Sequence, residues 1–477
     1  MDEAVKREPY WWEAAPPGDS AHATPLDLPQ TCDVAIVGAG YTGLSAALTL
    51  ARAGRNVQVF DARRPGEGAS TRNGGIASGN LRPSYAQLVK TFGRERADAI
   101  DREAVAARLD LKAFVEREAI DCDYQLVGRF SGAADVRAYD RLAREADRIA
   151  DRYQIEAFAV PRKEQRDHLG TDFYFGGMVR HDVGGVHPAK LHAGLLRVAQ
   201  AAGAVVHGET PVLNVQARGD GMALTTGRGT LLADHVIMAT NGYTDRLDGW
   251  LKRRLVPVAS RIIATRPLGD NLMAQLMPRG YMCSETRALH YYYRPSPDGS
   301  RILFGGRDGA IRGGSQRAER NLRRALADIF PELDGIDITH SWYGYVAMNR
   351  DFIPRVFSRD GVRYAAGYCG SGVVWARWAG QQTARALMAA QDARADASMD
   401  ALRAGPEAAR KSAHVEAGAQ ADAALIDAAA KGESALAFRP PPLVPLYNGT
   451  PWFMPITYAY MEAKDAWSAW QRRRQNG

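Results

Sequence analysis

The sequence predicts an α/β fold in which a Rossmann-type domain is interleaved with a second, α+β domain built on an antiparallel sheet. Three observations lead to this prediction. The chain has 477 residues, more than one hydrophobic core usually accommodates. Residues 33–61 follow the pattern of one βαβ unit. Residues 289–306 contain two aromatic or apolar runs around a Pro/Asp/Gly/Ser turn, which is typical of a β-hairpin.

The βαβ unit begins with a short β-branched run, DVAIV at 33–37, of the kind that forms a strand buried on both faces. A glycine-rich turn follows. Residues 44–53 then place small and apolar side chains at helical spacing, and Gly54 favours a helix end. A second run, NVQVF at 56–60, ends at Asp61. This order of elements predicts the start of a parallel sheet.

The remaining chain alternates helical and strand-like segments. Residues 84–151 are helical in pattern, and short apolar runs at 176–179, 205–206 and 235–238 indicate strands. Such alternation favours a nucleotide domain interleaved with a second sheet domain. We expect an N-terminal arm at 1–29, the first domain at 30–90, 182–248 and 341–389, the second domain at 91–181 and 249–340, an alanine-rich insert at 390–437 and a C-terminal tail at 438–477.

Two of these segments have unusual compositions. The arm has an aromatic cluster at 10–12 that needs a surface to cover it, so we expect it to pack on the body. The insert is rich in alanine, and its 392–434 stretch has no aromatic side chain. It is either a solvated helical excursion or a disordered insert.

The formal net charge is +7, with a pI near 9.2, which raises the question of a polyanionic partner. The arginines are scattered along expected helices and do not form one stripe. The densest run, 472–474, lies at the end of the chain, where a solvated tail is the simpler interpretation. We therefore expect no nucleic-acid partner.

The cysteines Cys32, Cys122, Cys283 and Cys369 lie far apart and never form a CxxC pair, which argues against a disulfide framework. The histidines show no clustered spacing, so we expect no metal. The first twenty residues lack an apolar core, and no run of about 18 apolar residues occurs. We expect a cytoplasmic protein without a membrane span.

The glycine turn carries the main chemical signal. Gly38 permits a tight turn out of the strand, Gly40 lets a pyrophosphate approach the backbone, and Gly43 lets the helix pack close to the strand. The helix N-terminus offers unpaired N–H groups to phosphates. Asp61 is placed to accept hydrogen bonds from a ribose. These features favour a dinucleotide with a free ribose diol, FAD or NAD over NADP, against a purely structural glycine turn.

Two further glycine-rich segments favour FAD over NAD. The run GASTRNGG at 68–75 can wrap a bulky ligand with its backbone, where a nicotinamide dehydrogenase would continue its βα alternation. The run GYCGSGV at 367–373 precedes an expected helix, and its N–H groups could face a flavin ring or ribityl chain. By itself the second run is equally compatible with an ordinary turn.

Taken together, these motifs resemble the D-amino-acid-oxidase superfamily of FAD-dependent enzymes, and within it the γ-glutamylputrescine oxidoreductase type. The resemblance rests on DVAIVGAGYTGLSAA, GASTRNGG, GGVHP at 184–188, ATNGYT at 239–244 and GYCGSGV. It spans roughly 10–389 and resumes at 447–453, so the alanine-rich stretch is a departure. The set is specific for the superfamily and does not specify a substrate.

The resemblance implies cofactor contacts in each of these segments and in a strand near residue 212. The expected FAD-binding residues are Gly38, Gly40, Tyr41, Thr42, Gly43, Asp61, Ala62, Arg63, Ser70, Thr71, Arg72, Asn73, Gly74, Gly75, Pro211, Val212, Thr240, Asn241, Gly242, Gly370, Ser371, Gly372 and Val373. Sarcosine-oxidase-like relatives capture the flavin with a cysteine, but the corresponding position here is Trp342, and 68–79 contain no histidine. Noncovalent FAD is therefore expected.

The substrate side is less determined. The segment 344–351 lacks an arginine where the glycine-oxidase pattern places one to clamp a carboxylate. Arg294 and Arg307 could take over that role, or could form structural salt bridges. We name Arg72, Tyr293, Trp342 and Tyr343 as candidates for the substrate cavity. Alternation gives the hairpin tyrosines opposite faces and does not say which face meets the flavin.

Two residues with reactive side chains have simpler roles available. Cys369 suits a small side chain filling a glycine loop. His187 precedes a proline at an expected helix start, where a structural hydrogen bond is the simpler interpretation.

The expected activity is oxidation of the C–N bond of an amine or amino-acid-like substrate to an imine, by hydride transfer to flavin. Molecular oxygen or another electron acceptor would then reoxidise the flavin. One alternative is a flavin monooxygenase or reductase, although these often carry a second GxGxxG or a CxxC that is absent here. The other is a non-catalytic flavin-bearing subunit of a complex.

Overall fold

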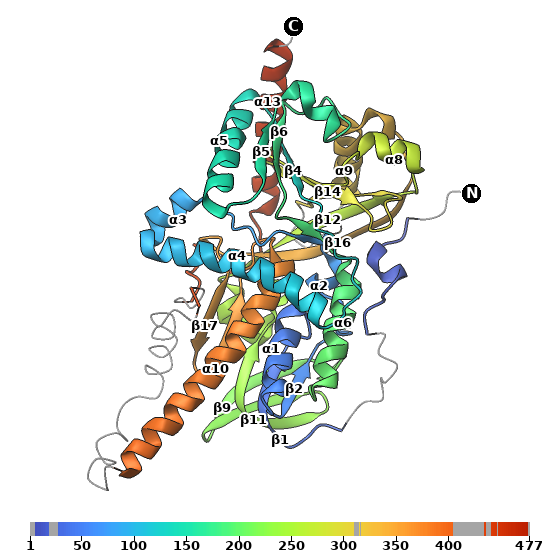
Figure 1. Ribbon diagram of the computed structural model, residues 1–477. Helices are drawn as coiled ribbons and strands as arrows, with labels where there is room; N and C mark the ends of the chain where they lie inside the picture. Colours follow the sequence, from blue (N-terminus) through green and yellow to red (C-terminus); the bar gives the residue numbers. More distant parts are fainter. Residues whose placement is uncertain are drawn as a thin grey trace.

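The structure is a computed structural model that describes residues 5–18, 27–309, 314, 316–403, 434–435, 440–445 and 447–475. Two eight-stranded sheets organise these residues. In the view of Figure 1 the first sheet occupies the lower half of the molecule and the second the upper half. The fold is therefore the expected α/β type with two interleaved sheet domains.

The first sheet has the order β17-β18-β11-β1-β2-β8, and β9 and β10 extend it from β11. The strand β1 pairs in parallel with both β2 and β11. This arrangement places the C-terminal ends of the parallel strands at one edge, where open α/β sheets bind ligands. The strands are β1 (Thr31–Val37), β2 (Val57–Phe60), β8 (Val205–His207), β9 (Val212–Arg218), β10 (Gly221–Thr226), β11 (Gly229–Met238), β17 (Arg355–Arg359) and β18 (Val362–Ala366).

Both faces of this sheet are buried because alternate side chains of β1 point to opposite sides. Val34 and Ile36 join the core under α1 (Tyr41–Arg52), α6 (Pro188–Ala201) and α10 (Gly372–Arg403), whereas Ala35 and Val37 join the core on the opposite face. Figure 1 shows α1 and α10 lying side by side against the sheet. The β-branched run thus forms the doubly buried strand that its composition predicts.

The second sheet has the order β16-β12-β15-β14-β13-β4-β6-β5. Its pairings are antiparallel except that of β4 with β13. Strands β14 and β15 form the expected hairpin. The strands are β4 (Arg129–Gly132), β5 (Ala157–Val160), β6 (Gly177–Arg180), β12 (Val256–Thr265), β13 (Met282–Glu285), β14 (Tyr292–Pro295), β15 (Ile302–Arg307) and β16 (Ile338–Met348).

The two faces of the second sheet have different neighbours. One face packs on α9 (Gln316–Ile329) through a core that includes Tyr293, Phe304 and Phe330. The other face carries Ile262, Tyr292 and Trp342 and packs with the N-terminal arm. This second face is the one turned toward the first domain, because the Tyr292 ring lies against Gly74.

Three other helices fall mainly within the expected helical stretch 84–151: α3 (Tyr85–Phe92), α4 (Arg94–Arg117) and α5 (Val136–Tyr153). The chain also contains α7 (Gly249–Lys252), α8 (Asp270–Leu276), α13 (Met454–Gln475) and the two-stranded ladder of β3 (Ile76–Ala77) and β7 (Gly184–Gly185). The C-terminal helix α13 docks on the second domain, where Asp465 accepts hydrogen bonds from the backbone N–H groups of Ala288 and Leu289.

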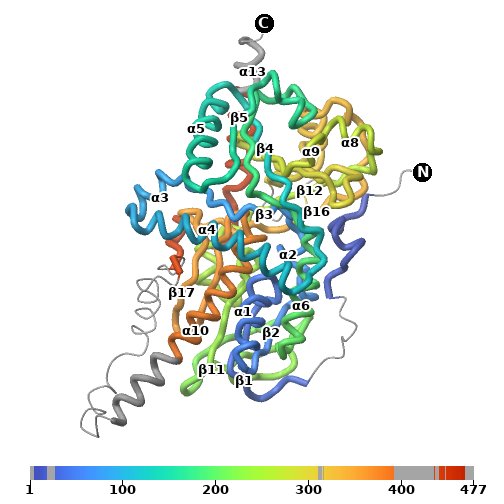
Figure 2. Tube along the Cα trace, viewed as in Figure 1, coloured from blue at the N-terminus to red at the C-terminus, as the bar shows by residue number. Residues whose placement is uncertain are grey.

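The N-terminal arm runs along the side of the molecule, as Figure 2 shows. Its short helix η1 (Tyr10–Glu13) buries Trp11, and Lys6 forms a β-bridge with His340 on β16. The aromatic cluster therefore lies on the body of the protein, which is the expected covering surface.

Two expectations on domain limits need adjustment. The boundary expected at residue 341 falls inside β16, which pairs with β12 from Ile338 to Met348, so we move the boundary to follow Met348. The alanine-rich insert begins inside α10, which continues to Arg403, and its residues 404–433 lie outside the described part of the chain. Among the described residues no helix is long and apolar enough to cross a membrane.

Candidate functional site

The glycine turn after β1 has the geometry that its sequence predicts. Gly38 has a φ of +108°, a conformation that side chains disfavour, and a Cβ on it would lie 2.9 Å from the carbonyl oxygen of Ala239. A Cβ on Gly43 would lie 1.8 Å from the carbonyl oxygen of Gly38. The chain can therefore enter α1 in this way only with glycine at both positions.

The N-terminus of α1 fits a diphosphate. Its N-cap, Gly40, contributes no side chain, and the first turn contains no acid, so the helix dipole is uncompensated within the helix. The Tyr41 N–H donates to Ser70 Oγ at 2.9 Å, which places the glycine-rich segment 68–75 directly over this terminus. Backbone N–H groups and small side chains are the donors that a diphosphate requires.

Asp61 lies at the end of β2 next to the turn. Its carboxylate accepts hydrogen bonds from the N–H groups of Ala39, at 2.8 Å, and Arg63, at 3.0 Å. Burial raises the pKa of Asp61 despite these bonds. The Thr210 N–H donates to the Asp61 carbonyl at 2.8 Å. The residues expected to contact the ribose and the adenine thus lie close together. Ala62, Arg63 and Pro211 are exposed beside Asp61, and Val212 is buried.

The segment 68–75 contains the short helix α2 (Ala69–Arg72) and is held by indole N–H groups. Trp11 Nε1–H donates to the Asn73 carbonyl at 2.8 Å, and Trp12 Nε1–H donates to Thr71 Oγ1 at 2.8 Å. Trp342 Nε1–H donates to the Arg72 carbonyl at 3.1 Å. The arm and β16 therefore fix this segment from the side of the second domain.

The end of this segment meets the hairpin. The Tyr292 ring would lie 2.9 Å from a Cβ on Gly74, so this glycine allows the close approach. Arg294 Nη1 donates to the carbonyls of Gly75, at 3.0 Å, and Val186, at 2.8 Å. The side of the hairpin that meets the 68–75 segment is thus the side of Tyr292 and Arg294.

The glycine-rich loop at 367–373, which leads into α10, borders the site. The Gly367 N–H donates to Asn241 Oδ1 at 2.9 Å, and Ser371 Oγ donates to the Asn80 carbonyl at 2.6 Å. Arg82 Nε donates to the Cys369 carbonyl at 2.8 Å. Gly370 is exposed, and α10 begins two residues later. This loop therefore joins the end of β11 to the region beneath the hairpin.

Several expected cofactor residues already use their side chains within the protein. Tyr41 Oη donates to the Pro188 carbonyl at 2.8 Å, and Thr42 Oγ1 shares a 2.7 Å hydrogen bond with Tyr368 Oη. Asn73 Nδ2 donates to the Ser70 carbonyl at 2.8 Å. These residues can offer a cofactor their backbone more readily than their side chains. The structure gathers the expected set around one edge of the first sheet: Thr240 adjoins Gly38, and Gly242 adjoins Ala347 of β16.

The substrate-cavity candidates are divided between the two faces of the second sheet. Tyr293 lies wholly buried in the core under α9, where its hydroxyl donates to Tyr174 Oη at 3.2 Å. This placement contradicts its selection as a cavity residue, because the turn between β14 and β15 leaves Tyr292, and not Tyr293, on the face toward the first domain. Sequence alternation separates the two tyrosines but cannot say which side is covered by a helix.

The other candidates lie beside the 68–75 segment. Trp342 is buried with Trp11 beneath this segment and supports it. Tyr343 is half-buried and points to the opposite face, and its carbonyl accepts a 3.3 Å bond from Arg72 Nη1. The Arg72 guanidinium also covers the Trp12 ring at 4.7 Å. Arg72 is therefore engaged by its protein neighbours.

The simpler interpretation holds for His187, whereas Arg294 has a structural role through hydrogen bonds and not through the expected salt bridge. His187 is the N-cap of α6, and its Nδ1 accepts from the Lys190 N–H at 3.2 Å. Arg294 donates from its guanidinium to backbone carbonyls. Cys369 has a φ of +52° in the glycine loop and its thiol contacts the Gly367 carbonyl at 3.1 Å. Burial raises the pKa of this thiol to about 11, which disfavours the thiolate at neutral pH.

The sequence suggests neither Arg82 nor His192 as a site residue, and it leaves open whether Tyr292 or Tyr293 faces the first domain. His192 Nε2–H donates to the Ala39 carbonyl at 2.8 Å, beneath the glycine turn. A histidine on the small-residue face of an expected helix gives no signal for such a contact. Arg82 follows the glycine-rich segment by seven residues, and only the fold brings it to Cys369.

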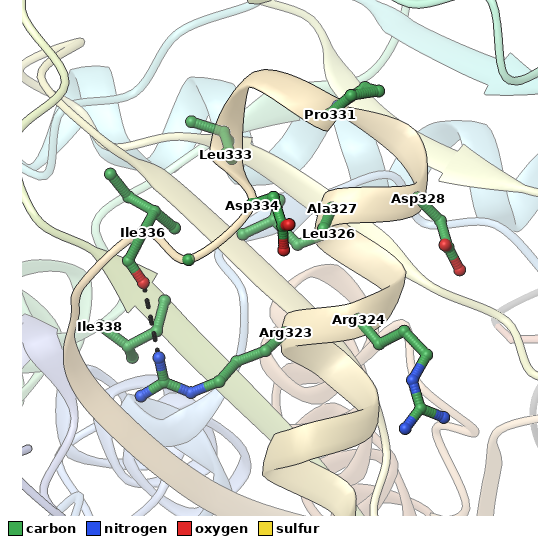
Figure 3. A pocket seen from close by; sticks show the side chains of 11 residues that line it. Arg323, Arg324, Leu326, Ala327, Asp328, Pro331, Leu333, Asp334, Ile336 and Ile338 are labelled. Atoms are coloured by element: carbon green, nitrogen blue, oxygen red, sulfur yellow. Dashed lines mark hydrogen bonds between the residues drawn. The ribbon is translucent and has the colours of Figure 1, made fainter.

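A separate pocket lies on the outer side of the second domain, at the end of α9 and the start of β16 (Figure 3). Its lining includes Arg323, Arg324 and Asp328, and Arg323 Nη1 donates to the Ile336 carbonyl at 3.4 Å. The pocket contains none of the glycine-loop residues. It is therefore distinct from the site described above.

Comparison with known proteins places the chain in a family. Residues 33–386 match the family described as FAD dependent oxidoreductase. The chain is 32% identical over 375 residues to a probable oxidoreductase OrdL of Rhizobium meliloti, covering 78% of this chain and 86% of that protein. It is 30% identical over 365 residues to the γ-glutamylputrescine oxidoreductase of Escherichia coli, covering 75% of this chain and 84% of that protein.

Solved structures have the same fold. The glycine oxidase of Geobacillus kaustophilus superposes with a TM-score of 0.61 at 22% identity, covering 74% of this chain and 93% of that one. An iminodiacetate oxidase of Chelativorans superposes with a TM-score of 0.61 at 21% identity, covering 75% and 95%. The family match agrees with the glycine turn, the acid after β2 and the two glycine-rich loops. This chain belongs to the D-amino-acid-oxidase family of FAD-dependent oxidoreductases.

Proposed function

We propose that this protein oxidises the C–N bond of an amine or amino-acid-like substrate to an imine, using FAD held noncovalently. The observation that carries the proposal is the contact between the glycine-rich segment 68–75 and one face of the second sheet, at Gly74 and Tyr292. The named relatives, a γ-glutamylputrescine oxidoreductase and glycine oxidases, support the substrate class.

The chain's own groups would position the cofactor. The N–H groups at the start of α1 hold the diphosphate, and Asp61 accepts from the adenosine ribose. The loop before α10 offers N–H groups to the ring. Trp342 occupies the place of the flavin-capturing cysteine in sarcosine-oxidase-like proteins. Its indole is buried and donates a hydrogen bond to the Arg72 carbonyl. FAD held by these residues would supply the hydride acceptor for the carbon next to the substrate nitrogen.

The second sheet supplies an environment in which an amine stays neutral. Tyr292 is half-buried on the facing side, and its hydroxyl lies 3.0 Å from Ser260 Oγ. His290 Nδ1–H donates to the Glu285 carbonyl at 2.9 Å, and burial lowers the pKa of His290 to about 4. An apolar region with cationic neighbours lowers the pKa of an amine, because it disfavours the charged form. A neutral amine has the lone pair that hydride loss requires.

Anaerobic reduction tests the proposal. The purified holoprotein should be yellow, should release its flavin on acid precipitation, and should lose its visible absorbance when an amine substrate is added without oxygen. A panel of amines, acylated polyamines and N-methyl amino acids would identify the substrate. Reduction by NADPH and not by any amine would favour a monooxygenase or reductase. Reduction by neither would favour a non-catalytic subunit.

Reoxidation addresses the electron acceptor. We propose that molecular oxygen or another acceptor restores the oxidised flavin. Rapid return of colour on admitting air after substrate reduction would identify an oxidase. Slow return that an artificial electron acceptor accelerates would identify a dehydrogenase.

A further inference from the structure

We propose that Arg307, with Arg82, forms an anion-binding site between the two sheets, and that the substrate is an amine carrying a separate carboxylate. The statement that the bound anion belongs to a substrate rests on the proposed function. Its physical basis, an unpaired guanidinium at the domain interface, stands on the geometry of the described residues.

The position of Arg307 follows from strand register. Arg307 pairs with Ser260, and Ser260 Oγ lies 3.0 Å from Tyr292 Oη, so Arg307 shares the face turned toward the first domain. Gly305, two residues earlier on this face, lies against the Tyr292 ring. The side chain of Arg307 is half-buried.

Arg307 has no hydrogen bond or ion pair with any residue in the part of the chain that the structure describes. Its sequence neighbour Asp308 points to the other face, where it accepts from Arg261 Nε at 3.1 Å. Arg294, on the neighbouring strand, donates to three carbonyls. Burial and the nearby Arg82 lower the pKa of Arg307 to about 10, which leaves it charged at neutral pH. A partly buried charge of this kind, with no acceptor among the described residues, favours the binding of an anion.

Arg82 supplies the second half of the site. Its Nε is held by the Cys369 carbonyl at 2.8 Å, and its Nη2 would lie 3.8 Å from a Cβ on Gly370. The remaining guanidinium N–H groups are therefore fixed near the glycine loop and have no protein acceptor among the described residues. Two guanidinium groups that come from different domains match a carboxylate, which accepts from planar donors in pairs.

The site differs from the carboxylate clamp that the glycine-oxidase pattern predicts. That clamp would fall in 344–351, which contains no arginine before Arg350, and Arg350 is exposed. The anion site on β15 lies on another strand. A substrate whose carboxylate is separated from the reacting amine by several bonds would satisfy both observations.

Equilibrium binding of propionate and its neutral isostere propionamide to the oxidised holoprotein tests the site without turnover. Titration calorimetry and the flavin difference spectrum provide two readouts. We expect Arg307→Gln to weaken propionate binding about 10- to 100-fold and to leave propionamide binding unchanged. Arg307→Lys should retain part of the affinity, and Arg82→Gln should weaken it as well. Arg323→Gln, in the outer pocket, is the matched control and should change neither ligand.

Two outcomes would overturn the site. The first is equal propionate affinity in the wild type and in Arg307→Gln, or no propionate binding at all. The second is loss of FAD from both Arg307 variants while the loaded fraction binds propionate normally, which would assign the arginine to the cofactor.

Reduction kinetics separate this inference from the proposed function. For 4-aminobutyrate, Arg307→Gln should raise the apparent Kd for flavin reduction, whereas for 1-aminobutane it should not. Reduction by amines with no Arg307 effect would reject the anion site and keep the function. Intact, Arg307-dependent propionate binding with no reduction by any amine would keep the site and reject the function.

Discussion

The nucleotide end and the ring end of the site are built from different parts of the chain. At the nucleotide end, one continuous stretch from β1 to Asp61 supplies the turn, the helix terminus and the acid, and most of its contacts come from backbone. At the ring end, side chains from the arm, α2, the hairpin and β16 meet across the two domains. The first arrangement leaves a sequence motif, and the second depends on tertiary packing.

The largest effect is expected from filling the glycine turn. Gly43→Ala places a methyl group 1.8 Å from the Gly38 carbonyl oxygen, so α1 must move away from β1. We expect loss of FAD from the purified protein and a destabilisation of about 3 kcal/mol. Flavin absorbance and chemical unfolding measure both. Gly249→Ala, where a Cβ meets nothing within 4 Å, is the control and should retain full flavin.

Acid should weaken the nucleotide end through His192. Burial lowers the pKa of His192 to about 4 from its ordinary value of 6.5. The unfolded chain therefore takes up this proton first as the pH falls, and stability present above pH 6.5 is lost toward pH 4. The loss amounts to about 3 kcal/mol at most. The free energy of unfolding of His192→Gln, measured over this range, should fall less steeply. Identical slopes for the two proteins would contradict the assignment.

At the ring end, we expect Arg294 to contribute to the stability of the protein and not to the binding of a substrate carboxylate. Arg294→Gln removes hydrogen bonds to the Gly75 and Val186 carbonyls and leaves these buried acceptors unpaired. We expect a destabilisation of about 2 kcal/mol and weaker flavin retention. Propionate affinity of the loaded fraction should stay within twofold of the wild type, about the error of such titrations. A selective loss of propionate binding would instead place the anion on Arg294.

The arm should contribute a smaller share to the same end. Trp11→Phe keeps an aromatic ring and removes the N–H that donates to the Asn73 carbonyl. We expect a loss of about 1 kcal/mol in stability and a several-fold weaker affinity for FAD. Fluorescence titration of apoprotein with FAD measures the affinity. Tyr10→Phe, at the same helix but without a bond to the 68–75 segment among the described contacts, should bind FAD normally.

The smallest effect separates the two faces of the hairpin. Tyr293→Phe removes a buried hydroxyl under α9 and should cost less than about 1 kcal/mol in stability, with no change in reduction kinetics. Tyr292→Phe removes the bond to Ser260 on the facing side and should change the rate of flavin reduction. Equal kinetic effects in the two variants would contradict the assignment of the faces.

The sequence predicted the fold class and the conformation of the glycine turn because both depend on local patterns. The run DVAIV is buried on both faces, and Gly38 and Gly43 occupy positions where a side chain would meet backbone atoms. The ring end depended on choices that local pattern leaves open. Tyr292 and Tyr293 have equal claims by alternation, and α9, which follows later in the chain, decides between them.

The same limit applies to the arginines. Arg294 and Arg307 are indistinguishable in sequence as carboxylate partners. The difference arises because Arg294 reaches carbonyls at 75 and 186, far away in the chain, whereas Arg307 has no such acceptor among the described residues. The domain limit expected at residue 341 likewise falls within a strand, because the pairing of β16 with β12 extends past this residue without a change in composition.

The long strand β16 has a consequence for how this protein can diversify. It pairs with the second sheet along its length, and at Gly344 and Ala347 its backbone lies against Arg72 and Gly242 of the first domain. The two domains therefore cannot be exchanged independently between related proteins. A chimera that inherits β16 from one parent and the 68–75 segment from another would have to rebuild this junction, so new specificities are more accessible through substitutions on β14 and β15 than through recombination.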